Sequence, residues 1–135
     1  MLDASITLAW CFEDQATALS DSVRDRLTDE PALVPELWPF EVANALVTAE
    51  RRGRLTGSQA SRFVQLLNQL PITVEELGRA GVLGAARALA QTSELTAYDA
   101  SYLFLAASGG VPLATTDRAL REAALRTGVA LIEPA

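Results

Sequence analysis

The chain has 135 residues and a formal net charge of −6, and half of its residues are hydrophobic. Its eleven basic residues are all arginine, and it contains neither lysine nor histidine. This composition excludes imidazole general bases, Ser–His and Cys–His nucleophile pairs, the phosphate-loop lysine and Schiff-base chemistry. Any catalysis by this chain must therefore depend on carboxylates and bound metal.

Length and cysteine usage favour one globular domain, residues 1–135, in a reducing compartment. The single cysteine, Cys11, lies in the apolar segment LAWCF and cannot form an internal disulfide, so we interpret it as a small buried side chain. The N-terminus lacks the basic region of a secretory signal, and no apolar run reaches the ~18 residues that span a bilayer. We therefore expect a cytoplasmic protein without a membrane segment.

Short apolar runs alternate with longer helical patterns, which predicts a parallel sheet covered by helices. The expected strands are a short one that ends at Asp3, followed by 32–34, 72–74, 112–115 and 129–132. The expected helices are 5–12, 16–27, 38–52, 56–70, 76–91, 96–108 and 118–126. Ser5 is expected to cap the first helix, and Thr56 with Gln59 forms a capping box for the fourth. The predicted fold class is α/β, with a short parallel central sheet between two layers of helices.

Four carboxylates lie in apolar stretches: Asp3 in MLDAS, Glu41 in PFEVANAL, Asp99 in LTAYDASYLFLA and Asp117 in LATTDRAL. Acidic side chains are almost never fully buried unless they are paired or bound to a cation. Asp3, Asp99 and Asp117 fall at expected strand-to-helix junctions or helix N-termini, where parallel sheets place their ligand sites. Glu41 lies within a helix and is expected to project from it toward the same place.

Each of these carboxylates also has an ordinary structural explanation. Asp117 could be an N-cap, and Asp99 could form a loose capping box with Thr96. Asp3 could be a turn residue, and Glu41 could be a first-turn charge favoured by the helix dipole. These explanations do not account for the combination, in particular for an acid at the mouth of the nearly apolar helix that begins at Thr96.

The segments MLDASITLAWCFEDQ, PELWPFEVANAL, LTAYDASYLFLA and LATTDRAL together resemble the PIN-domain ribonucleases, and within that family the VapC-type toxins of bacterial toxin–antitoxin pairs. The resemblance spans the whole chain, with its segments in the family's order. It implies a PIN-like fold in which Asp3, Glu41, Asp99 and Asp117 are the catalytic residues and the acidic metal cluster. It further implies that the substrate is RNA, cut endonucleolytically, that an antitoxin is the protein partner, and that the toxin forms a homodimer.

Carboxylate oxygens without histidine or cysteine select Mg²⁺ or Mn²⁺ over zinc. Two such ions about 4 Å apart can orient a water and neutralise charge at a phosphodiester without a protein nucleophile. They would also offset the net charge of −6, which is otherwise unfavourable for nucleic-acid binding. An alternative function is a non-catalytic PIN-like scaffold that binds a partner. Receiver domains and haloacid-dehalogenase-type phosphatases are set aside because their usual arrangement requires a lysine.

Several other residues have roles that the sequence leaves open. Thr115 matches a hydroxyl position near the acidic cluster of the family. Ser5 and Asn44 match recurring positions that a helix cap and a helix-packing amide explain equally well. Glu94 is an acid close to Asp99 in sequence.

A basic cluster and a group of aromatic residues each have two interpretations. Arg51, Arg52 and Arg54 either hold RNA phosphates or form a solvated helix C-terminus that complements the helix dipole. Large aromatic side chains near the expected first and third helices either belong to the core or form a groove for a partner helix. These aromatic residues are Trp10, Phe12, Trp38 and Phe40.

Overall fold

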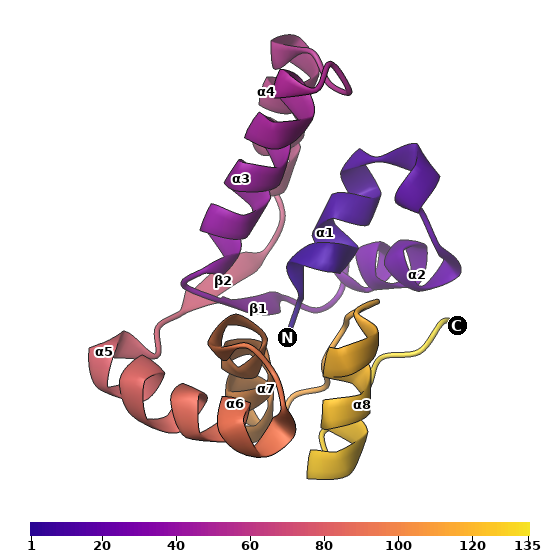
Figure 1. Cartoon of the computed structure of the whole chain (residues 1–135). Helices are drawn as coiled ribbons and strands as arrows, with labels where there is room; N and C mark the ends of the chain where they lie inside the picture. The colour runs from indigo at the N-terminus through magenta and orange to yellow at the C-terminus, as the bar shows by residue number, and fades with distance from the viewer.

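Helices surround a thin parallel sheet in the computed structural model, which describes all of residues 1–135 (Figure 1). The helices are α1 (Ala4–Cys11), α2 (Ala18–Arg26), α3 (Trp38–Arg51), α4 (Gly57–Asn68), α5 (Gly78–Gly81), α6 (Arg87–Ser93), α7 (Ala97–Gly109) and α8 (Arg118–Thr127). A 3₁₀ turn at Glu13–Gln15 follows α1, and a π-helical segment at Val82–Ala86 joins α5 to α6. Figure 1 shows α3 and α4 projecting together from the rest of the molecule.

The sheet is parallel and short, as the sequence predicts. Strands β1 (Ala32–Pro35) and β2 (Ile72–Glu75) pair in register, with Ala32 opposite Ile72. Further segments extend this layer by single contacts: Leu2 N–H donates to Leu33 O at 2.8 Å, and parallel bridges join Leu2 to Ala114 and Leu113 to Leu131. The order across the layer is 72–75, 32–35, 1–3, 112–115 and 130–132.

This strand order places a topological switch point between the segments 1–3 and 112–115. The chain winds outward in one direction from residues 1–3 to β1 and β2, and in the other direction from 112–115 to 130–132. In open parallel sheets, ligands bind at the carboxyl ends of the strands that flank such a point. Asp3 and Thr115 lie at those two ends.

The predicted α/β class is confirmed, but several predicted elements are corrected. The segments 112–115 and 129–132 form isolated bridges instead of full strands. The helix predicted over 76–91 begins at Gly78 and contains a π-helical segment at Val82–Ala86, which overlaps the end of the glycine-rich stretch between Gly78 and Gly84. Short strands and glycine-containing helices carry weak periodic signals, so their regularity is hard to read from sequence.

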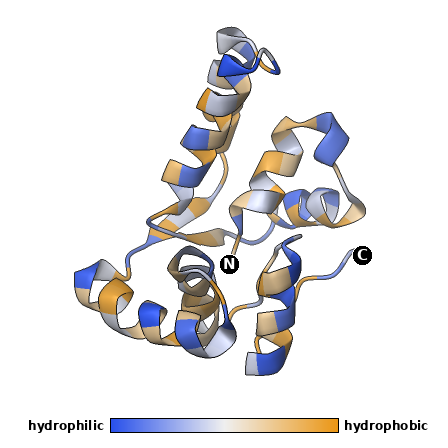
Figure 2. Cartoon of the chain, in the orientation of Figure 1, coloured by the Kyte–Doolittle hydropathy of each residue, from blue (hydrophilic) through white to orange (hydrophobic).

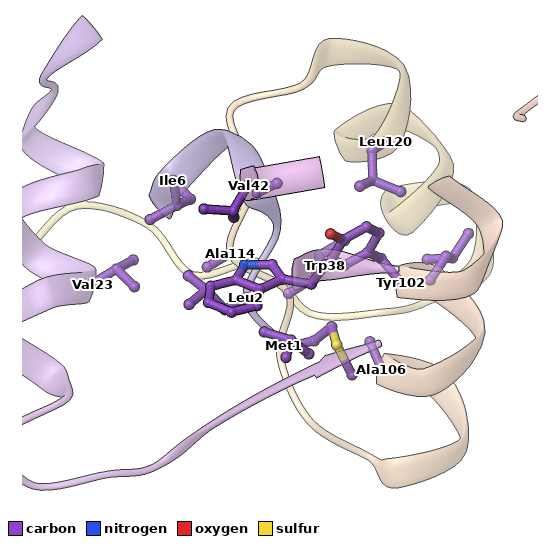
Figure 3. Packing of buried hydrophobic residues seen from close by; sticks show 14 of the residues in the cluster. Met1, Leu2, Ile6, Val23, Trp38, Val42, Tyr102, Ala106, Ala114 and Leu120 are labelled. Atoms are coloured by element: carbon purple, nitrogen blue, oxygen red, sulfur yellow. The ribbon is translucent and has the colours of Figure 1, made fainter. Parts of the chain in front are cut away.

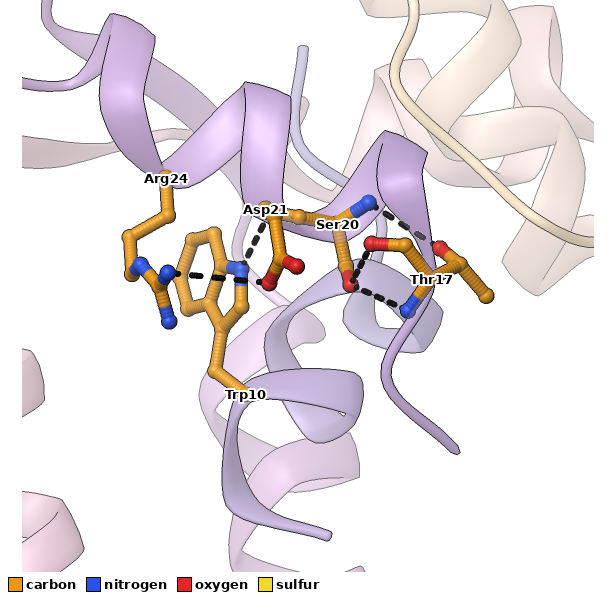
Figure 4. Close-up of polar contacts among 5 residues, drawn as sticks. All are labelled: Trp10, Thr17, Ser20, Asp21 and Arg24. Carbon is orange, nitrogen blue, oxygen red and sulfur yellow. Dashed lines mark hydrogen bonds and ion pairs between the residues drawn. The ribbon is translucent and has the colours of Figure 1, made fainter. Parts of the chain in front are cut away.

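Helix starts follow local side-chain chemistry closely. The predicted capping box of Thr56 and Gln59 is present at the start of α4. A second box is formed by Thr17 and Ser20, so α2 begins at Ala18 and not at 16 (Figure 4). The Trp10 indole N–H donates to Ser20 O at 2.8 Å, which ties α1 to the start of α2 (Figure 4).

A cluster of 21 buried residues joins the sheet to the helices around it. Trp38, Leu2 and Tyr102 pack at its centre (Figure 3). The Trp38 indole N–H donates to the Thr7 hydroxyl at 3.1 Å, so the polar edge of this buried ring has a partner. Figure 2 shows hydrophobic and hydrophilic residues alternating along α3 and α8, as expected for helices with one buried face. None of the helices is both long and apolar enough to cross a bilayer.

Candidate active site

The four carboxylates singled out in the sequence line one open cleft of about 390 Å³. They come from the N-terminal ends of four helices: Asp3 precedes α1, Glu41 lies in the first turn of α3, Asp99 lies in the first turn of α7, and Asp117 precedes α8. In Figure 1, α1, α3 and α8 all begin near the centre of the molecule. No arginine is among the residues that line the cleft, so the cleft is strongly acidic.

Asp3 is the most buried of the four, with 6% of its surface exposed. Its Oδ2 accepts hydrogen bonds from the Thr115 hydroxyl at 2.6 Å and from the Ser5 hydroxyl at 2.7 Å. Burial raises the pKa of Asp3, and these two hydrogen bonds oppose that rise. The two hydroxyls therefore hold a buried carboxylate in a fixed orientation without any cationic side chain beside it.

Ser5 has a different role from the one predicted. Asp3 occupies the N-cap position of α1 but makes no capping hydrogen bond, and Ser5 lies inside the helix. The Ser5 hydroxyl accepts the N–H of Thr116 at 3.1 Å while it donates to Asp3. Ser5 thus links α1 to the loop that carries Thr115 and Asp117, and the prediction that it caps the helix is wrong.

Asp117 is both an N-cap and a residue of the cleft. Its Oδ1 accepts the N–H of Leu120 at 2.8 Å, and its own N–H donates to the Thr115 hydroxyl at 3.0 Å. The side chain is exposed on the cleft wall. The capping explanation and the cleft position are therefore compatible for this residue.

Glu41 is held by a residue that the sequence did not single out. The Tyr102 hydroxyl donates to Glu41 Oε1 at 2.5 Å, and Tyr102 itself is fully buried. Partial burial raises the pKa of Glu41, the Tyr102 hydrogen bond opposes this, and the charges of Asp3 and Asp99 raise it further. One signal was available in the sequence: Tyr102 follows Asp99 by three residues on the same helix, which places both on one face.

Burial and the neighbouring acids both raise the pKa of Asp99. Partial burial raises its pKa to about 6, with further contributions from the charges of Asp117 and Asp3. Its backbone N–H donates to the Thr96 hydroxyl at 3.1 Å, so Thr96 caps α7 as the sequence suggests. The capping interaction uses the backbone of Asp99 and leaves its carboxylate in the cleft.

The side chains present fit a hard divalent cation by their chemistry. Four carboxylates, the Ser5 hydroxyl and the Asn44 amide line the cleft, so every ligand atom that it offers a cation is oxygen. The charges of Asp117 and Asp3, which add to the effect of burial on the pKa of Asp99, also favour a bound cation. No three acidic or cysteine side chains are already arranged to hold a metal ion in this structure.

The remaining residues considered in the sequence lie in different places. Asn44 is exposed and lines the cleft, so it is not a helix-packing amide. Glu94 ends α6 in the left-handed conformation (φ 54°), is exposed and does not line the cleft. Cys11 is half-buried.

Burial separates three of the four aromatic residues from the fourth. Phe12 and Trp38 are buried, and Trp10 packs against the core. Phe40, with 77% of its surface exposed, lies on the surface beside Glu41. The core interpretation therefore holds for three of them.

Comparison with known proteins identifies the family. The model of the PIN domain family matches residues 1–125, so the chain belongs to the PIN-domain family. It is 39% identical over 87 residues to Ribonuclease VapC3 of Pyrobaculum aerophilum, a match that covers 64% of this chain and 66%, just under two thirds, of that protein. It is 34% identical over 102 residues to Ribonuclease VapC3 of Mycobacterium tuberculosis, covering 76% of this chain and 72% of that protein.

A solved structure agrees with this assignment. The crystal structure of PAE2754 from Pyrobaculum aerophilum superposes with a TM-score of 0.70 at 28% sequence identity, over 90% of this chain and 82% of that one. The resemblance to VapC-type PIN-domain proteins that the four sequence segments indicate is confirmed.

Proposed function

We propose that this protein is a divalent-metal-dependent endoribonuclease and the toxin of a toxin–antitoxin pair. The observation that carries the proposal is that acidic side chains from four separate helices line one cleft that has no basic side chain in its wall. The relatives named Ribonuclease VapC3 support the same activity and support RNA as the substrate class.

In this proposal Asp3, Glu41, Asp99 and Asp117 hold Mg²⁺ or Mn²⁺. When bound, the cation supplies Lewis acidity, which lowers the pKa of a water and neutralises charge at the phosphodiester. No protein nucleophile is needed, which agrees with a chain that has neither histidine nor lysine.

The chain's own residues orient the carboxylates. Thr115 and Ser5 fix the Asp3 carboxylate, and Tyr102 fixes Glu41. Because each of these donors is attached to a different segment of the fold, the two acids are positioned by tertiary structure before substrate arrives. Such preorganisation reduces the reorientation needed to assemble the reactive site.

The activity is tested with purified protein and single-stranded RNA. We expect cleavage in Mn²⁺ or Mg²⁺ with 5′-phosphate and 3′-hydroxyl ends, no cleavage in EDTA, and no cleavage by Asp99→Asn. Cleavage that persists in EDTA, or that Asp99→Asn retains at the wild-type rate, would refute the proposed mechanism. A folded wild-type protein that binds Mn²⁺ in the cleft and cuts no RNA would favour the non-catalytic scaffold.

The toxin role has a separate test in cells. Induced expression of the wild-type chain should arrest growth, whereas Asp99→Asn expressed to the same level should not. Equal growth arrest by both would contradict the catalytic explanation and leave the burden of expression as the cause.

We also propose an antitoxin as the protein partner, a homodimer as the assembly, and the cytoplasm, where the RNA substrate lies, as the compartment. An apolar groove between α3, α4 and β2 supports the first of these, since Trp38, Val42, Leu46 and Leu67 line it. Co-expression with the product of a neighbouring small gene should yield a complex in which the toxin is neutralised.

The proposed homodimer is tested by light scattering. The isolated chain should give the mass of a dimer, and the mass of a monomer would contradict the proposed homodimer.

A further inference from the structure

A second groove adjoins the acidic cleft along α1 and α3. Its lining includes Leu8, Asn44 and Ala45, and these three residues also line the acidic cleft. The two hollows therefore share a wall and form one continuous path on the surface. The lining of the second groove is Leu8, Phe12, Gln15, Asn44, Ala45, Thr48, Ala49, Arg52 and Arg54.

One face of α3 runs the length of this path. Glu41, Asn44, Thr48 and Arg52 are spaced by three or four residues and line one hollow or the other. With a rise of about 1.5 Å per residue, Arg52 lies about 16 Å along the helix axis from Glu41. The path thus begins at the acids and ends at a basic residue a few nucleotide lengths away.

The charge at the basic end is available to a ligand. Arg52 is exposed and takes part in none of the chain's five ion pairs. Arg54 stacks over the Phe12 ring at 4.9 Å and pairs with Asp14 at 3.4 Å, so its guanidinium is held in the groove wall. Arg51 is also exposed and lacks an ion pair, but it does not line the groove.

We propose that the groove lined by Gln15, Asn44, Thr48, Arg52 and Arg54 is a phosphate subsite for the RNA strand. This inference rests on the proposed ribonuclease function, because it assumes that RNA occupies the adjoining acidic cleft. An acidic cleft repels a polyanion, so a neighbouring guanidinium that carries no internal partner supplies the attraction that the cleft lacks. Amide and hydroxyl groups beside it can donate further hydrogen bonds to phosphate oxygens.

Two adjacent arginines distinguish a phosphate contact in the groove from a general effect of charge. Arg52→Gln and Arg51→Gln remove the same charge from adjacent exposed positions, and only the first lies in the groove. Binding is measured by fluorescence anisotropy with a short labelled single-stranded RNA of mixed sequence, in EDTA so that no cleavage occurs. We expect Arg52→Gln to weaken binding by about threefold to tenfold and to lower the salt slope by about 0.7, the value for one lost phosphate contact on a single strand. Arg51→Gln should change affinity by less than about twofold.

A variant that should tighten RNA binding instead of weakening it strengthens the test. Asp14→Asn releases Arg54 from its carboxylate partner, and we expect it to tighten RNA binding by about twofold, since a competing anion is removed. Asp21→Asn is its matched control, because Asp21 is also an exposed aspartate in an ion pair, with Arg24 (Figure 4). Asp21 lies on α2 and does not line the groove.

Several outcomes would overturn the subsite. Equal losses from Arg51→Gln and Arg52→Gln would indicate general electrostatics, and unchanged RNA affinity in Arg52→Gln would show that Arg52 contacts no phosphate. Wild-type protein that does not bind the RNA at low salt would also refute it. The proposed function is judged separately: cleavage of the same RNA by the wild type in Mn²⁺, without any effect of Arg52→Gln on binding, rejects the subsite and retains the nuclease.

Discussion

Asp3 and Asp117 both occupy the N-cap position of a helix, at the ends of two neighbouring parallel segments. Asp117 is exposed and accepts the Leu120 N–H, as an ordinary cap does. Asp3 is buried, makes no capping hydrogen bond, and accepts two hydroxyl donors instead. The same residue type at the same position therefore has a sufficient structural explanation at α8 and none at α1. A buried carboxylate without a cationic neighbour is costly, and this cost supports the proposal that Asp3 binds a cation.

The largest expected effect concerns cleavage, where the two aspartates should behave alike. Asp3→Asn and Asp117→Ser each remove one carboxylate from the cleft, and we expect each to lower RNA cleavage by at least about a hundredfold in Mn²⁺. The measurement is the single-turnover rate on one RNA at saturating metal. If Asp117→Ser cleaves at the wild-type rate, Asp117 is only a cap, and the acidic cluster has three members.

A smaller effect concerns the pH dependence of stability without metal. Because the native pKa of Asp99 (about 6) lies above its ordinary value of 3.8, the native state binds more protons than the unfolded state between these values. The free energy of unfolding should therefore fall as the pH rises from about 4 to about 6. Asp99→Asn should reduce this fall and be more stable than wild type at neutral pH by about 1 kcal/mol, a value reduced from the full shift because solvent screens a half-buried carboxylate.

Urea unfolding at several pH values in EDTA checks this expectation. Asp25→Asn is the control, since Asp25 is an exposed carboxylate on α2 outside the cleft. A pH profile of Asp99→Asn that coincides with the wild-type profile would show that neither burial nor the neighbouring acids raise the pKa of Asp99.

The free energy of unfolding should respond differently to substitutions of Asp117 and of Asp3. Asp117→Ala removes the hydrogen bond to Leu120 and should lower the free energy of unfolding by about 1 kcal/mol, whereas Asp117→Ser keeps a capping oxygen and should remain within a few tenths of wild type. Asp3→Asn should be neutral or stabilising without metal, because it removes a buried charge. Destabilisation by Asp3→Asn comparable to that of Asp117→Ala would mean that Asp3 also serves the fold.

The smallest expected effect on cleavage is at Tyr102, which acts on the cluster through Glu41. Tyr102→Phe keeps the buried ring and removes the donor to Glu41, so the pKa of Glu41 should rise further. We expect the acidic limb of the pH–cleavage profile to move to higher pH, with a loss of about 1 kcal/mol in stability at neutral pH. A purely structural role for Tyr102 would lower stability and leave the pH profile unchanged.

Much of the candidate site could be predicted from local sequence. Asp3, Asp99 and Asp117 adjoin helix starts that short motifs define. The caps at Thr56, Thr96 and Asp117 could be predicted because each joins residues only three positions apart. The order of parallel segments then brings these helix ends to one edge.

Contacts between distant segments could not be predicted in the same way. Tyr102 and Glu41 are 61 residues apart, and Thr115 and Asp3 are 112 apart, so no local pattern reveals either hydrogen bond. The prediction that Ser5 caps α1 is wrong for the same reason. A serine after a strand is typical of a helix cap, and the hydrogen bond from the Thr116 N–H that gives Ser5 its actual role comes from a distant segment. The orientation of the acids is thus a property of tertiary packing.

The central claim is that the four carboxylates form one cation-binding cluster, and metal-dependent melting tests it most directly. A cation that binds only the native state stabilises it by about 2.7 kcal/mol at a hundredfold excess over its Kd. We expect the Tm of the wild type and of Asp25→Asn to rise with added Mn²⁺, and the Tm of Asp3→Asn and Asp99→Asn to show little or no rise. If Asp3→Asn and Asp99→Asn keep the wild-type response to Mn²⁺, the cation binds elsewhere and the claim is contradicted.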